Sequence, residues 1–150
     1  LKIGDVAEVK TPVGLGYVHY THFHREYRQL VRMLPGLYEQ QPDLAELVQR
    51  QELGVVFVFL QESVNDGDIS KVVGNFPVPA RCTAFPLFRT DGGSLKNGNA
   101  PRWWFWDGER DWLVGQITPE QRRMPLAEVL SETALVNRLV KQWTPESDTR

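Results

Sequence analysis

The sequence predicts an α+β domain dominated by strands: a strongly bent, mostly antiparallel sheet or partly open barrel, covered by two or three helices. Short runs rich in β-branched and aromatic residues recur through most of the chain, and turn sequences rich in glycine, proline or aspartate separate them. Helical spacing is confined to a few stretches. The length of 150 residues and the 41% hydrophobic share indicate a single domain over residues 1–150, whose tail, 144–150, we expect to be frayed.

The first elements are expected to be paired strands. The sequence "TPVGLG" is typical of a turn, so the preceding "KIGDVAEVK" and the following "YVHYTHF" (17–23) should form a hairpin. A third strand is expected within 25–34. The sequence "PDLAELVQRQEL" (42–53) then predicts a short amphipathic helix, with Asp43 as its N-cap and Glu46 as the capping-box partner.

The helix is followed by the longest apolar run of the chain, "GVVFVFL" (54–60), which we place as a central strand covered on both faces. The sequence "RWWFWDGERDWLVGQI" (102–117) predicts a hairpin with Asp107-Gly108 at its bend. The sequence "TPEQ" (118–121) predicts a capped helix of about one turn, which Pro125 stops. The remaining expected elements are a polar turn at 62–68, a strand at 69–76, a short strand from Phe85 to Phe88, a long surface loop at 90–101 and a last helix at 126–143.

Composition and charge disfavour several classes of protein. The net charge is −2, with 17 basic and 19 acidic residues and no dense basic stripe, so we expect no nucleic-acid partner. No apolar run approaches the roughly 18 residues of a membrane helix, so we expect no membrane partner. Cys82 is the single cysteine, which excludes an intrachain disulfide and favours a reducing, cytoplasmic location. No signal peptide is visible in a chain that begins at Leu1.

All three histidines lie in the run "HYTHFH". On a strand, His22 and His24 share a face, and such a pair is a known zinc-ligand geometry, with Glu26 as the nearest further ligand. However, the sequence has no H-E-x-x-H motif, no second histidine cluster, and no phosphate-binding, dinucleotide-binding or nucleophile-elbow motif. We therefore interpret the histidines as ordinary residues at a strand end, and we expect no catalytic residue, no metal and no cofactor.

The run "WWFW" (103–106) is the most unusual feature of the sequence. On a strand, Trp103 and Phe105 face one way and Trp104 and Trp106 face the other, so both faces of the hairpin carry large aromatic side chains. Two interpretations follow. Either both aromatic layers belong to the core, or one of them is an exposed surface that binds a partner or ligand.

Several motifs resemble the immunity protein 26 family of bacterial polymorphic-toxin immunity proteins. These motifs are "KIGDVAEVKTPVGLGYVHY", "LVRMLPG" and "WWFWDGERDWLVGQITPEQRRMPL", whereas the middle of the chain, 42–101, matches only loosely. The resemblance implies a bacterial cytoplasmic protein that binds a cognate toxin, such as a basic nuclease, and occludes its active site. It implies no enzymatic activity. The positions that match the family's "GD" and "P-x-G-x-x-Y" patterns are Gly4, Asp5, Pro12, Gly14 and Tyr17.

Under this interpretation, the chain needs a surface that complements the toxin. The residues predicted to contact the partner are Glu62, Asp66, Asp68, Trp104 and Trp106, with the 90–101 loop beside the acidic group. Two alternatives remain open. The chain is a small-ligand or peptide-binding β-barrel module with a pocket lined by Trp104 or Trp106, or it is a metal-dependent enzyme that uses the His19–His24 cluster. Its expected state is a monomer, or a homodimer formed through the last helix.

Overall fold

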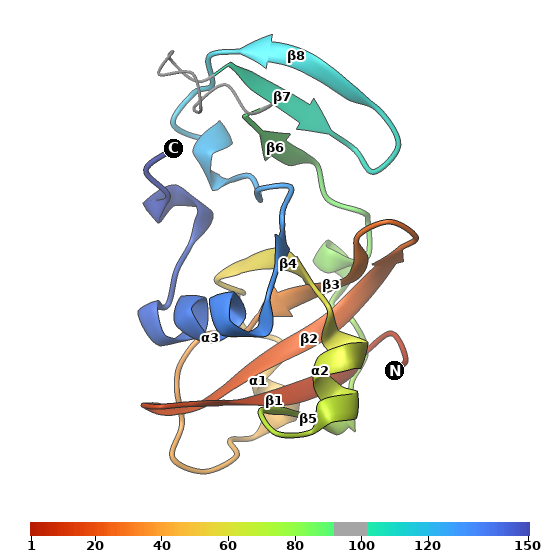
Figure 1. Cartoon of the computed structure of the whole chain (residues 1–150), viewed down its shortest axis with the longest axis vertical. Helices are drawn as coiled ribbons and strands as arrows, with labels where there is room; N and C mark the ends of the chain where they lie inside the picture. The colour runs from red at the N-terminus through yellow and green to blue at the C-terminus, as the bar shows by residue number, and fades with distance from the viewer. Residues whose placement is uncertain (92–101) are drawn as a thin grey trace.

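The computed structural model describes residues 1–91 and 102–150, and these residues form two sheets and three α-helices (Figure 1). In spatial order the larger sheet contains β5 (Ser70–Asn75), β1 (Asp5–Thr11), β2 (Gly14–His24), β3 (Arg28–Met33), β4 (Gly54–Val58) and β9 (Val129–Leu130). The smaller sheet contains β6 (Phe88–Thr90), β7 (Trp103–Trp106) and β8 (Asp111–Gly115). The smaller sheet forms one end of the molecule, at the top of Figure 1.

Consecutive antiparallel strands build most of the larger sheet, as the sequence predicts. β1 and β2 pair around the turn Pro12-Val13, with Thr11 opposite Gly14. β2, β3 and β4 continue the antiparallel pairing, whereas β9 joins β4 in parallel. The described residues form no closed barrel. The prediction of a strand-dominated α+β fold is confirmed in its open form, a mostly antiparallel sheet covered by helices.

Helices cover both faces of the larger sheet. α2 (Leu60–Asp66) and α3 (Glu132–Lys141) pack on one face, where a large apolar cluster joins them to the strands. α1 (Leu44–Leu47) packs on the opposite face, where Leu47 lies in a second cluster with Tyr17. Because successive strand residues point to opposite faces, β1 and β2 each contribute to both clusters.

The last helix begins later than predicted. The sequence predicts it over 126–143, but α3 begins after Ser131, whose hydroxyl accepts a hydrogen bond from the Ala134 backbone N–H. The two residues before this cap, Val129 and Leu130, form β9 and pair with β4. Their backbone groups therefore find hydrogen-bond partners in the sheet, and the serine cap sets the start of the helix.

Two further predictions are wrong in their details. The stretch 62–68 is predicted to be a polar turn, but its first five residues belong to α2, which Gly67 ends in the left-handed conformation at φ 73°. Packing of Leu60 on the sheet favours a helix in spite of the turn-forming sequence. α1 has its predicted cap, since the Asp43 carboxylate accepts from the Glu46 N–H, but it is much shorter than the predicted helix.

The predicted hairpin at 102–117 is confirmed as β7 and β8. At its bend the Asp107 carboxylate accepts hydrogen bonds from the two backbone N–H groups that follow Gly108. The predicted loop 90–101 lies almost entirely outside the described residues, and its flanking strands β6 and β7 pair in one sheet, as expected. The short strand predicted from Phe85 to Phe88 begins only at its last residue, as β6.

An aromatic cluster and the C-terminal segment join the two sheets. Phe57 of β4 stacks on Phe88 of β6 with 5.3 Å between ring centroids, and Trp106 packs beside both. The tail, expected to be frayed, forms a 3-10 turn at Pro145–Ser147, and the carbonyl oxygen of its buried proline accepts a hydrogen bond from Arg89 at 3.0 Å. The tail is therefore packed on the domain.

Candidate functional site

The histidine side chains of β2 are engaged in hydrogen bonds within the fold. His22 donates from Nε2 to the Thr83 carbonyl oxygen at 2.8 Å, and its Nδ1 lies 2.9 Å from the Thr21 hydroxyl. His24 donates from Nε2 to the Gly108 carbonyl oxygen at 2.9 Å, and its Nδ1 accepts two backbone N–H groups of the following turn. Within residues 1–91 and 102–150, no group of three His, Cys, Asp or Glu side chains is placed to hold a metal ion.

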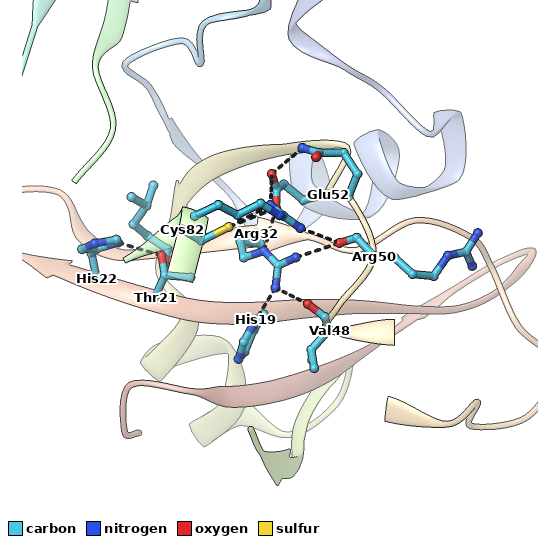
Figure 2. A network of polar contacts seen from close by, with 11 residues as sticks. His19, Thr21, His22, Arg32, Val48, Arg50, Glu52 and Cys82 are labelled. Carbon is cyan, nitrogen blue, oxygen red and sulfur yellow. Dashed lines mark hydrogen bonds and ion pairs between the residues drawn. The ribbon is translucent and has the colours of Figure 1, made fainter. Parts of the chain in front are cut away.

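His19 belongs to a buried polar network (Figure 2). It lies directly opposite Arg32 of β3, and both residues are completely buried. Arg32 Nη1 donates to His19 Nδ1 at 2.9 Å, and His19 Nε2 donates to the Phe76 carbonyl oxygen at 3.0 Å. Burial is the main cause that lowers the pKa of His19; the Phe76 carbonyl opposes this shift and the Arg32 charge adds to it. His19 is therefore a neutral structural residue.

Arg32 also determines the path of the chain after α1. Its Nη1 donates to the Val48 carbonyl oxygen and its Nη2 to the Arg50 carbonyl oxygen, each at 2.9 Å (Figure 2). A continuing helix would use these carbonyl groups for its own backbone hydrogen bonds. The buried arginine therefore explains why the helix predicted over 42–53 ends after one turn.

Glu52 completes the network with the charge that Arg32 requires. Its Oε1 accepts from Arg32 Nε and from Arg81 Nη1, both at 2.8 Å, and its Oε2 accepts from Gln51 at 2.8 Å. Burial would raise the pKa of Glu52, but the hydrogen bonds and charges of Arg81 and Arg32 outweigh it and hold this pKa below its usual value. The carboxylate is ionised and occupied, so it is poorly placed to act as a general acid or base.

Cys82 borders this network and is only partly buried. Its sulfur lies 3.4 Å from Glu52 Oε1 and 3.0 Å from Arg81 Nη1. Burial raises the pKa of the Cys82 thiol, and the Glu52 charge raises it further. A nucleophilic cysteine requires the opposite shift. The thiol is therefore not an activated nucleophile.

These side chains line a hollow of about 370 Å³ on the face of the larger sheet opposite α2 and α3. Its volume falls within the range of small-ligand sites. Arg32 lies at its buried side, whereas Arg81 and Arg123 have side chains that are 41% and 71% exposed. The apolar part of the lining includes Leu53, Val55, Ala84, Phe85, Pro86, Pro125 and Pro145.

The five predicted contact residues fall into two separate groups. Glu62 and Asp66 lie four residues apart on α2, Asp68 follows the end of that helix, and all three are exposed. Trp104 and Trp106 lie on β7, at the other end of the molecule (Figure 1). The structure therefore does not bring the acidic and aromatic groups together. The loop predicted to lie beside the acidic group falls outside the described residues.

The "WWFW" strand alternates as predicted. Trp103 and Phe105 are buried, whereas Trp104 and Trp106 are partly exposed. Trp106 packs into the aromatic cluster between the sheets, and with Trp104 it borders a second hollow of about 410 Å³. One face of β7 is therefore core, and the other is partly packed and partly exposed.

The neighbouring strand β8 has an exposed apolar edge. Trp112, Leu113 and Val114 are consecutive, and their exposed fractions are 42%, 45% and 36%. Among the described strands β8 pairs only with β7. Edge strands usually carry charges or prolines that prevent association, and this one does so only at Asp111. An apolar edge of this kind is typical of a protein-binding surface.

Fold and site together define a strand-dominated α+β protein with a buried arginine network and an exposed aromatic edge. Comparison of the chain with protein-family models, with curated proteins and with solved structures finds no match. In the structure, residues of the motifs that resemble immunity protein 26 serve the fold: Gly4 has φ 96°, and the buried Tyr17 hydroxyl donates to Glu8 at 2.8 Å. No helix of the described ranges has the length and hydrophobicity needed to cross a bilayer.

Sequence reasoning missed the three residues at the centre of the site. Arg32 had a usable signal, because it interrupts the apolar run "LVRML", and an arginine flanked by core residues requires buried partners. The sequence around Glu52 and Arg81 carries no comparable signal. They are 29 residues apart and meet only in the folded chain.

Proposed function

We propose that this protein is a toxin-neutralising immunity protein that acts in the bacterial cytoplasm by stoichiometric binding to a cognate toxin. The proposal assigns it no catalytic activity. The sequence motifs support the family, and the engaged histidines, the occupied Glu52 and the protonated Cys82 thiol support a binding role rather than a chemical one. The observation that carries the proposal is the exposed apolar edge of β8.

β8 offers two means of recognition. Its outer backbone edge can pair with an extended segment of the toxin, which gives affinity through main-chain hydrogen bonds. Its side chains add a hydrophobic anchor, and Leu113 lies directly opposite Trp104 in the sheet register. Leu113, Trp104 and Trp106 therefore share one face of the smaller sheet, and aromatic residues are frequent anchors in protein interfaces.

Interface size favours one surface over two. A standard protein interface buries about 800 Å² on each partner, or about a tenth of a small protein's surface, and this chain exposes 8363 Å² in total. One compact interface does not reach from β8 to the acidic end of α2. The proposal therefore places the toxin on β8 with Trp104 and Trp106. The acidic residues Glu62, Asp66 and Asp68 stay a second candidate surface, which would steer a basic toxin.

The test is co-expression with the products of neighbouring genes, followed by affinity purification and a toxicity assay. One stoichiometric partner whose toxicity this chain suppresses is the expected result. Leu113→Lys should weaken the complex at least about a hundredfold, because it places a charge in the buried centre of an interface. Val72→Lys is the matched control: it changes an apolar residue of similar exposure, 41%, on β5, an edge strand of the larger sheet.

The outcomes separate the surfaces. Loss of binding only in the combined variant Glu62→Lys, Asp66→Lys and Asp68→Lys would move the interface to α2 and keep the function. Equal binding by wild type, Leu113→Lys and the acidic variant would reject both surfaces. Absence of any partner, with unchanged toxicity of every neighbouring product, would contradict the proposed function itself.

A further inference from the structure

The hollow beside Arg32 has an excess of positive charge. Its lining contains three guanidinium groups, those of Arg32, Arg81 and Arg123, and one carboxylate, that of Glu52. Glu52 is shared between Arg32 and Arg81. Arg123 pairs with Glu146 at 3.2 Å, but both side chains are largely exposed, at 71% and 56%, and such pairs are weak. The lining itself therefore carries three cations and one carboxylate.

The guanidinium groups that line the hollow keep N–H donors that no described residue accepts. Arg81 uses its two terminal nitrogens on Glu52, on Cys82 and on the Arg50 carbonyl oxygen, and its Nε–H has no hydrogen bond to a described residue. Among the described residues, the Arg123 guanidinium pairs through Nε with Glu146. Glu52, the carboxylate of the lining, receives hydrogen bonds at both oxygens. A ligand that enters the hollow therefore meets guanidinium N–H groups, which prefer carboxylate or phosphate oxygens.

The apolar part of the lining favours anions that carry an apolar group. Leucine, valine, phenylalanine and three prolines form the apolar walls, with Phe85 and Pro125 among them. A bare inorganic anion would gain nothing from these walls, whereas an apolar body would be removed from water. The volume of about 370 Å³ leaves room for such a body beside the charged group.

We propose that this hollow binds a small organic carboxylate, whose carboxylate pairs with Arg81 and Arg123 and whose apolar body packs on Phe85 and the prolines. The site is distinct from the β8 edge, and it goes beyond the proposed toxin binding. Arg32 is a positioning residue here: it donates to Glu52, and Glu52 in turn accepts from Nη1 of the Arg81 guanidinium.

The test uses three probes of matched shape and different charge: benzoate, benzamide and benzylamine. Binding to the whole chain is followed by two-dimensional NMR, on the backbone signals of Leu53, Cys82 and Phe85 and on the Nε–H signal of Arg81. Saturable shifts with benzoate are expected at these signals. Benzamide should bind at least about tenfold more weakly, because it lacks the charge-assisted hydrogen bonds, and benzylamine should cause no shifts there.

Two variants and one control locate the site. Arg81→Gln should weaken benzoate binding at least about tenfold, and Arg123→Gln should weaken it about threefold. Because Arg123 is largely exposed, its replacement leaves the fold intact, and the test does not depend on the stability of the Arg81 variant. Arg110→Gln, an exposed arginine in the β7–β8 turn, should bind benzoate as the wild type does. Equal affinity for benzoate and benzamide, unchanged affinity in Arg123→Gln, or no saturable shifts at the lining residues would each overturn the proposal.

Discussion

Arg32 and Glu52 form an ion pair inside the domain, with 2.8 Å between Arg32 Nε and Glu52 Oε1 and no exposure of the arginine side chain. The pair connects β3 to the segment after α1, and Arg81 extends it to the 3-10 turn Ala80–Cys82. On the same face of the sheet, apolar clusters lie to either side of it. The ion pair is therefore a buried polar contact between two apolar clusters on this face of the sheet.

Removal of the carboxylate should destabilise the protein strongly. Glu52→Ala leaves Arg32 buried without a charged partner, and breaking a buried pair in this way costs about 3 kcal/mol in the free energy of unfolding. Glu39→Ala, which removes an exposed carboxylate, should change that free energy by less than about 0.5 kcal/mol. Urea unfolding of both variants checks this, and similar effects in the two would contradict a role for the buried pair.

Acid should destabilise the fold through His19. In the unfolded chain His19 binds a proton near its ordinary pKa of about 6.5, whereas in the folded chain its pKa is lowered, chiefly by burial. Below pH 6.5 the unfolded state therefore holds more protons, and the free energy of unfolding falls with pH by up to about 1.4 kcal/mol per unit. Above pH 6.5 the contribution of His19 is fully present.

Denaturant unfolding at a series of pH values between about 7 and 5 measures this loss. His19→Gln is the informative variant, because its amide keeps a donor for the Phe76 carbonyl and an acceptor for Arg32 but does not titrate. Its stability should vary less with pH across this range. A wild-type profile as flat as that of the variant would show that His19 titrates normally.

Gly4 should not tolerate a side chain. Its φ is 96°, and a Cβ atom there would lie 2.7 Å from the Phe76 carbonyl oxygen, which is fixed backbone. Gly4→Ala should lower the free energy of unfolding by about 3 kcal/mol. Gly115 is a matched control with φ 92° and no atom within 4 Å of the Cβ position, so Gly115→Ala should cost only about 1 kcal/mol. Thermal unfolding of the two variants gives the comparison, and equal losses would rule out the steric clash.

Cys82 should react slowly with alkylating reagents in the native protein. Burial and the Glu52 charge raise the pKa of its thiol, so little thiolate is present near pH 8. Iodoacetamide labelling followed by mass spectrometry should be slower for the folded chain than for the chain in denaturant. Glu52→Gln should speed labelling of the folded state, since it removes the neighbouring negative charge. Native labelling as fast as that of the unfolded chain would show an ordinary, accessible thiol.

The parts of the fold that the sequence predicted depend on local chemistry. Alternation along "WWFW" and the Asp43 cap are set by neighbouring residues, and both are confirmed. The parts of the fold that were not predicted depend on residues far away in the sequence. α2 forms from turn-prone residues because Leu60 packs on the sheet, and β9 exists because β4, more than 70 residues earlier, offers its edge.

In the candidate site, too, the features set by neighbouring residues were predicted and those set by distant residues were not. That His22 and His24 lie at the end of a strand was predicted from the sequence, and the structure places both on β2, with each ring bonded to a backbone carbonyl group. The arginine network could not be predicted in full, because its ion pairs join three separate segments. The exposure of β8 was equally hidden, since "WLV" in a sequence reads as core whether or not another strand covers it.

Residues near the C-terminus complete the core, and this has a consequence for folding during synthesis on the ribosome. Leu130, Leu135 and Leu139 cover the same face of the sheet as Val18 and Val31, which are made about a hundred residues earlier. A growing chain must therefore leave part of that apolar face uncovered for several seconds, at typical elongation rates of about 5–20 residues per second. Chaperone binding to nascent chains that end before residue 130, and its release once α3 emerges, would be the cellular sign of this delay.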